Sequence, residues 1–194
     1  METILKDLRY AIGLGAVLGV ILVLFLLGSG EADPLLFWQW LLRWIHVISG
    51  IMWIGLLYYF NFVQIPNMPN IPDDQKPAIG KVIAPAALWW FRWSAMSTIV
   101  AGIILAHLNG YLIDAITLNG NFWGIGVGMW LGTIMWFNVW FVIWPSQQKA
   151  LGMVEVGPEE KAAAARTAML FSRTNTVLSI PMLIAMTVQQ NPFA

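Results

Sequence analysis

Long apolar stretches alternate with short polar stretches along the chain, and this alternation predicts the architecture. Each apolar stretch has about 20 or more residues, the length that an α-helix needs to cross the hydrocarbon core of a bilayer. We therefore expect an all-α fold over residues 1–194: a polytopic membrane helical bundle with five transmembrane helices and no soluble second domain. The expected spans are residues 9–29, 36–64, 92–113, 122–144 and 169–188.

The polar connections differ in character. Residues 65–77 carry four prolines, and this spacing predicts an extended, polyproline-like backbone. Residues 78–91 have an interfacial composition. Residues 157–168 are expected to begin a helix that continues into the last span, because Pro158 suits a first helical position and two glutamates follow it.

Composition supports a membrane protein and excludes several functions. The chain is 59% hydrophobic and only 10% charged, whereas soluble domains have about 25% charged residues. Its net charge is zero, which gives no reason to expect a nucleic-acid partner, so the lipid bilayer is the expected environment. The absence of cysteine excludes disulfides, cysteine-ligated iron–sulfur clusters and covalently attached haem c.

The basic residues predict an orientation. Arg43 lies inside the second expected span, and with five spans the other lysines and arginines all fall on one side of the membrane. Because cytoplasmic loops are enriched in Lys and Arg, we expect the N-terminus inside and the C-terminus outside. The expected location is a bacterial inner (cytoplasmic) membrane.

Polar and small residues gather on one face of the second expected span. Positions three or four apart share a face of a helix, and a face of this composition is expected to point into the protein rather than into lipid. His46 is its most reactive member, and Gly50, one turn away, leaves room for a bulky group. The face consists of Gln39, Arg43, His46, Gly50, Trp53, Leu57 and Asn61.

The second histidine, His107, lies in the third expected span. With the expected boundaries, His46 and His107 lie roughly 15 and 9 Å from the outer edge, on helices adjacent in sequence. Two such imidazoles can ligate a haem iron, and Arg43 can pair with the haem propionates at the wet end. We therefore predict a cofactor site for haem b, with His46 and His107 on the iron and with Arg43, Gly50 and Trp53 around it. The alternative is that His46 bonds only to a neighbouring helix and Arg43 reaches the headgroups.

The fourth and fifth expected spans carry packing signals. Gly124, Gly128 and Gly132 form a repeated GxxxG ridge, which lets helices approach closely. Asn138, Asn175 and Ser179 are expected to line the bundle interior and to bond across it; a quinone or small-molecule site is the alternative. Pro181 is expected to kink the last helix.

Four stretches together resemble a known family. They are RWIHVISGIMWIGLLYYFNFVQ (43–64), WWFRWSAMSTIVAG (89–102), GTIMWFNVWFVIWPSQQK (132–149) and SRTNTVLSIPMLIAM (172–186). In this order they are similar to the membrane N-terminal half of the membrane-bound urate oxidase (urate hydroxylase) family. The first stretch, with its histidine in an early helix, also resembles more weakly the copper-resistance membrane proteins and the haem-binding membrane protoporphyrinogen oxidases. The resemblance implies a helical membrane module tied to redox chemistry, with His46 as the matched family histidine.

Two functions follow as hypotheses. The first is a haem b or metal-binding electron-transfer subunit. The second is a cofactor-free accessory subunit of a larger membrane energy-transducing complex. The family's full-length enzymes carry a C-terminal cytochrome c domain, but this sequence has no CxxCH motif. We therefore do not expect the chain to oxidise urate alone, and we expect other membrane subunits or a separate cytochrome as partners.

Overall fold

The structure is a computed structural model that describes residues 5–28, 30 and 33–188. Residue 29, at the end of the first predicted span, and residues 189–194 lie outside the described part. The described residues form helices, turns and bends without a strand. By its contacts, the chain divides into two compact units, residues 1–38 and 39–194.

The first unit consists mainly of α2 (Leu8–Leu27). Asp7 begins α2, because its side chain accepts a hydrogen bond from the Arg9 backbone N–H at 2.8 Å. Asp33 likewise accepts from the Leu35 N–H at 2.7 Å and begins the next helix. Within this unit none of the residues of α2 is buried, and its apolar side chains suit a lipid environment.

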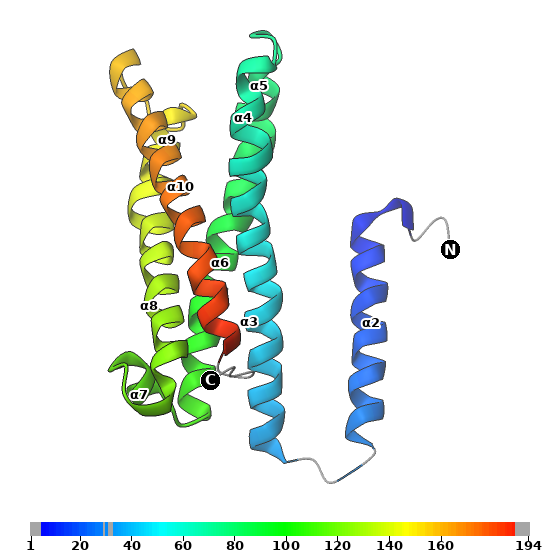
Figure 1. The fold of residues 1–194 in the computed structure, drawn as a ribbon. Helices are drawn as coiled ribbons and strands as arrows, with labels where there is room; N and C mark the ends of the chain where they lie inside the picture. Colours follow the sequence, from blue (N-terminus) through cyan, green and yellow to red (C-terminus); the bar gives the residue numbers. More distant parts are fainter. Residues whose placement is uncertain (1–4, 29, 31–32, 189–194) are drawn as a thin grey trace. The chain divides into compact units, whose positions relative to one another are not determined.

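The second unit contains four long helical stretches that run alternately in opposite directions, as Figure 1 shows. α7 (Leu112–Ile116) caps one end of the bundle between the second and third of these stretches. The stretches consist, in chain order, of α3 (Pro34–Tyr58), η1 (Tyr59–Gln64), α4 (Ile65–Asn67) and η2 (Met68–Asn70); α5 (Lys76–Ala78), η3 (Ile79–Ile83) and α6 (Ala84–Leu108); η4 (Gly120–Phe122), α8 (Trp123–Phe137), η5 (Asn138–Ile143) and α9 (Trp144–Ala150); and α10 (Pro158–Val188).

Three of these stretches contain a π-helical segment, and each segment ends two residues before a proline. The prolines are Pro66, Pro85 and Pro145. A proline has no N–H and its ring clashes with the carbonyl four residues earlier. A wider π turn before it accommodates that carbonyl without ending the helix.

This adjustment explains where the predicted connections were wrong. Residues 65–70 continue the helix instead of forming an extended segment, because Pro66 and Pro69 each occupy the first turn of a new helical segment. The third span was expected over residues 92–113. Its helical stretch begins earlier, at Lys76, and α6 ends at Leu108, so residues 109–113 lie beyond that helix. α10 continues through Pro181 from Pro158 to Val188.

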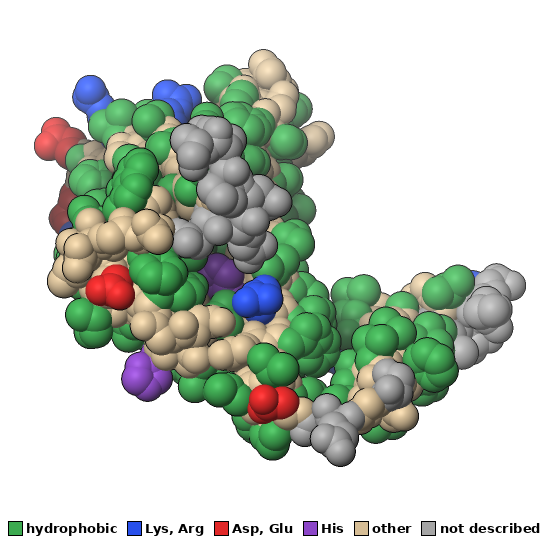
Figure 2. Space-filling model, turned by 60° about the horizontal axis from the view of Figure 1, so that its bottom comes forward, with side chains coloured by type: hydrophobic (Ala, Val, Ile, Leu, Met, Phe, Trp, Pro, Cys, Tyr) green, Lys and Arg blue, Asp and Glu red, His purple; other side chains and the backbone are tan. Residues whose placement is uncertain are grey.

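The core lies between the helices of the second unit and is aromatic and aliphatic. Trp53, Leu57, Phe91, Met135 and Val139 are at most 1% exposed. Many other large apolar side chains are exposed, and Figure 2 shows them covering most of the visible surface. In a water-soluble protein such a surface would aggregate, whereas a bilayer accommodates it.

Among the described residues, five helical stretches are long and apolar enough to cross a membrane: Leu8–Leu27, Pro34–Asn70, Lys76–Leu108, Gly120–Ala150 and Pro158–Val188. The all-α membrane fold with five candidate spans is thus confirmed. The last four have 31 to 37 residues, roughly 45–55 Å of helix against a hydrocarbon core of about 30 Å, so their ends extend beyond it. The inside position of the N-terminus stays a prediction.

Candidate functional site

His46 on α3 is held by the backbone of α6. Its Nδ1 lies 2.8 Å from the carbonyl oxygen of Thr98. A carbonyl oxygen only accepts, so Nδ1 carries the hydrogen and the neutral ring keeps its lone pair on Nε2. Among the described residues Nε2 has no hydrogen-bond partner, and the side chain is half-buried. This is the tautomer in which Nε2 can bind a metal.

Gly102 is the position that lets the imidazole lie against α6. A Cβ atom at Gly102 would stand 2.8 Å from Nδ1 and 2.9 Å from Cε1 of His46. Any other residue there would push the ring away from the Thr98 carbonyl. Gly50 lies on α3 at the same contact. A Cβ atom at Gly50 would stand 3.9 Å from the γ-methyl of Thr98. The two glycines therefore bring α3 and α6 together around His46.

Gln39 of the polar face and Ser49, which lies beside this face, also reach α6. The Gln39 amide donates to the Leu108 carbonyl at 2.9 Å, and the Ser49 hydroxyl donates to Ser97 at 2.8 Å. Trp53 is buried in the core, and its indole N–H has no acceptor among the described residues. Trp53 thus contributes core packing two turns from His46.

Arg43 is exposed and lies near the connection that follows α6. Burial raises the pKa of the Tyr111 phenol above its usual value, and the positive charge of Arg43 partly offsets this rise in pKa. Tyr111 also stacks on Phe122, with ring centroids 5.2 Å apart. Arg43 therefore has an aromatic neighbour at this end of the bundle and no ion pair among the described residues.

The structure does not bring His107 to His46. His107 is exposed, whereas His46 lies on the face of α6 that contains Thr98 and Gly102. Five residues separate Gly102 from His107, which turns the side chain about 140° around the helix. The two histidines, the only ones in the sequence, appear as separate purple patches in Figure 2.

The glycines of α8 pack within the chain. A Cβ atom at Gly124 would meet Val188 at 3.0 Å, and one at Gly128 would meet Ala185 and Met186 of α10 at 3.2 Å. Gly132 has more room, with the nearest atom, on Ile99 of α6, at 3.9 Å.

Gly126, between the ridge positions, is the most restricted of these glycines. A Cβ atom there would run into the backbone carbonyl of Ala115 in α7. It lies off the GxxxG spacing, which is why sequence reasoning missed it.

Asn138 and Asn175 join α8 and α10 in the interior. The Asn138 amide donates to Asn175 Oδ1 at 2.8 Å, and the Asn175 amide donates to the Met135 carbonyl at 2.9 Å. Ser179 is fully buried, with its Oγ 3.0 Å from the Tyr58 hydroxyl. These residues bond across the bundle interior, to one another and to Met135 and Tyr58.

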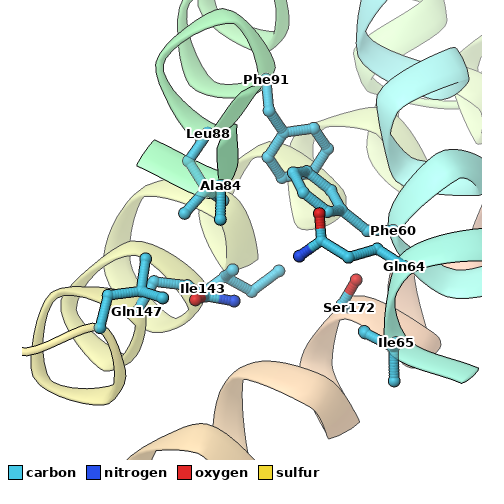
Figure 3. A pocket seen from close by; sticks show the side chains of 10 residues that line it. Phe60, Gln64, Ile65, Ala84, Leu88, Phe91, Ile143, Gln147 and Ser172 are labelled. Carbon is cyan, nitrogen blue, oxygen red and sulfur yellow. The ribbon is translucent and has the colours of Figure 1, made fainter. Parts of the chain in front are cut away.

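A small cavity lies at the other end of the bundle from α7, about 50 Å³ in volume. Figure 3 shows the Gln64 amide and the Ser172 hydroxyl pointing into it, with Gln147 on another wall. Gln64 Oε1 is buried and has no donor among the described residues. This space suits a few water molecules, which need polar partners of this kind, and is too small for a haem.

The fold and this interior define a helical membrane protein whose polar groups are gathered between its helices. A family model described as urate oxidase N-terminal matches residues 114–194. The matched residues make up less than half of the chain, and over them the chain is similar to the urate oxidase N-terminal family, which agrees with the resemblance seen in the sequence. The match covers α8 and α10, whereas His46 lies outside the matched residues. No curated protein and no solved structure matches the chain.

Proposed function

We propose that the protein is a membrane electron-transfer subunit that binds haem b through Nε2 of His46. The observation that carries this proposal is the 2.8 Å contact between His46 Nδ1 and the Thr98 carbonyl, which leaves Nε2 as a free lone pair. Ligating histidines almost always donate their other ring N–H in this way, and the bond fixes the ring and increases the basicity of the ligating nitrogen.

The donor set favours haem over a bare metal ion. In the described part of the chain, no three His, Cys, Asp or Glu side chains lie close enough together to hold a metal. A bare ion such as zinc takes three or four protein ligands, but a haem iron brings four porphyrin nitrogens and needs one or two more. A single anchored imidazole fits the second requirement.

The surrounding residues suit the same group. Gly102 makes room for the His46 ring itself, and Gly50 has only the Thr98 methyl near it, so the two glycines support the position of the ring. Arg43, one turn towards the start of α3, is exposed and is the residue we assign to a propionate. Because His107 lies on another face of α6, we expect this chain to supply one axial ligand.

Haem b, when bound, supplies a one-electron redox couple. The chain's own part is to orient the His46 imidazole through Thr98 and to keep it half-buried. The sequence has no CxxCH motif, so we propose that a separate cytochrome or membrane subunit exchanges electrons with the protein.

Titration of the purified protein with haemin in detergent tests this function. We expect a Soret band that saturates at about one haem per chain and that His46→Gln abolishes. His107→Gln is the matched control, because it removes the other imidazole of the chain, and we expect it to leave the band unchanged. Equal binding by the His46→Gln variant and the wild type would refute the proposal.

A cofactor-free accessory subunit is the second candidate, and α2 favours it. Within its own compact unit none of its 20 residues is buried, so the helix offers an apolar surface that a partner subunit can pack against. Isolation in a gentle detergent is then expected to recover the chain with other membrane subunits. Recovery as a lone monomer that contains haem would leave only the first function.

A further inference from the structure

We propose that Arg92 of α6 and the tryptophans around it bind the phosphate of an anionic phospholipid. The Arg92 cluster, as we call it, lies towards the end of the bundle that α4, α9 and the start of α10 form in Figure 1. It consists of Arg92, Trp89, Trp93, Trp140 and Trp144.

Arg92 carries a charge that the described residues do not balance. The ion pairs among them join Lys76 to Asp73 and Lys149 to Glu160, and neither includes Arg92. The Nε of Arg92 donates to the Leu88 carbonyl at 3.3 Å, which is a long bond, and the side chain is half-buried. A partly desolvated guanidinium in an apolar environment is costly unless an anion accompanies it.

The aromatic contacts leave the edge of the guanidinium available. Its central carbon lies 3.2 Å from the ring centroid of Trp144 and 5.7 Å from that of Trp140. At 3.2 Å the guanidinium has to stack on Trp144, since an edge-on approach would press a nitrogen into the ring. Stacking uses the face of the guanidinium, whereas its N–H groups point outward in its plane. Two of these parallel N–H groups can donate to two oxygens of one phosphate.

The depth of Arg92 fits a headgroup. Sixteen residues separate Arg92 from Leu108 at the end of α6, or about 24 Å of helix. If Leu108 lies near one interface, Arg92 lies about 6 Å from the other, given a hydrocarbon core of about 30 Å. The bond to Leu88 directs the side chain towards that nearer interface.

The exposed tryptophans favour a lipid over a free anion as the ligand of Arg92. Trp89 and Trp93 are each 48% exposed beside Arg92, and Trp93 meets Trp140 edge to face with ring centroids 5.4 Å apart. Tryptophan prefers the level of the headgroups, where its ring is apolar and its N–H is wet. A phosphate that reaches Arg92 with acyl chains attached covers these rings, but inorganic phosphate does not.

Native mass spectrometry of the full-length protein, with equal concentrations of phosphatidylglycerol or phosphatidylcholine, tests the site. We expect the wild type to retain phosphatidylglycerol about tenfold more strongly. Both lipids carry a phosphate, but the quaternary ammonium of phosphatidylcholine cancels its net charge and weakens its attraction to Arg92. Arg92→Gln is expected to lose this preference. Arg166→Gln is the matched control, because Arg166 is an exposed cation on α10 at the same end, and it is expected to keep the preference.

Three results would overturn the proposal: no preference for phosphatidylglycerol in the wild type, an unchanged preference in Arg92→Gln, or displacement of the lipid by an equal concentration of inorganic phosphate. Each variant is first checked for a single species in size-exclusion chromatography. If Arg92→Gln does not fold, Arg92→Lys replaces it, since lysine keeps the charge but lacks the stacked guanidinium. A Lys variant that binds the lipid as strongly as the wild type would also refute the site.

Discussion

Substitution of Gly102 by alanine tests the packing of His46 against α6 most sharply. The new Cβ would stand 2.8 Å from Nδ1 of His46, a distance that real Cβ contacts do not show. The imidazole therefore has to swing away and give up its bond to the Thr98 carbonyl. We expect Gly102→Ala to lower the free energy of unfolding and to weaken haemin binding in the same variant.

The size of the effect follows from three contributions. Overpacking costs about 1–3 kcal/mol, and loss of a hydrogen bond costs about 0.5–1.5 kcal/mol. Replacing a helical glycine by alanine returns about 0.5–1 kcal/mol. The net loss is about 1–3 kcal/mol. Gly50→Ala is the control at the same helix contact, because its Cβ would meet only the Thr98 methyl at 3.9 Å, and we expect it to be neutral or slightly stabilising.

Reversible unfolding in mixed detergent micelles, followed by circular dichroism, measures these free energies. The decisive comparison is a double-mutant cycle with His46→Ala, which removes the ring that Gly102→Ala would strike. In that background Gly102→Ala is expected to cost nothing. If it destabilises the protein equally with and without the His46 ring, the packing of His46 on Gly102 is not the reason for the glycine.

Three further predictions concern the rest of the bundle. Gly126→Ala is expected to destabilise the protein by at least about 2 kcal/mol, because its Cβ meets the rigid Ala115 carbonyl, whereas Gly132→Ala in the same unfolding assay is expected to be near neutral. Asn175→Ala is expected to cost about 2–4 kcal/mol, since it leaves the buried Asn138 amide without its acceptor and removes the side-chain bond to the Met135 carbonyl, which keeps its backbone N–H partner. Thr174→Ala, at an exposed site on the same helix, is the control, and equal effects of the two substitutions would contradict the role of the network. Tyr111 is expected to ionise above the usual pKa near 10 in a difference titration at 295 nm against Tyr111→Phe, and Arg43→Gln is expected to raise this pKa further. The pKa of Tyr111 is higher in the folded than in the unfolded protein. Its contribution to the free energy of unfolding is therefore present below pH 10 and is lost as the pH rises through the folded-state pKa. A Tyr111 that titrates at or below the usual value would refute its burial.

Hydrophobic patterning predicts the class of fold because the bilayer permits few alternatives. Five apolar stretches suffice to predict five helices, since a spanning segment has to satisfy its backbone internally. The ends of the helices were less predictable. Hydropathy detects the part of a helix that lies in lipid, but Pro158 and the two glutamates after it showed that the last helix starts earlier. The π segments before Pro66, Pro85 and Pro145 have no signal in hydropathy at all.

The candidate site was predictable only in part, for a similar reason. The polar face of α3 identified His46, because a histidine among small residues on one face has to meet the protein interior. Its partners, Thr98 and Gly102, belong to another helix, and their role depends on the relative rotation of α3 and α6. The same rotation separates His107 from His46, although both were expected at similar depths. Which side chains of two helices face each other depends on the tertiary structure. The spacing of residues within one helix does not predict it.

The tautomer of His46 tests the central claim most directly. In a His107→Gln protein, His46 is the single histidine, so ¹⁵N-labelled histidine reports on one ring. At pH 8 and without haemin, where an ordinary imidazole is neutral, we predict a protonated Nδ1 and an unprotonated Nε2. A proton on Nε2 and none on Nδ1 would contradict the bond to Thr98 and remove the lone pair on which the proposed haem ligand depends.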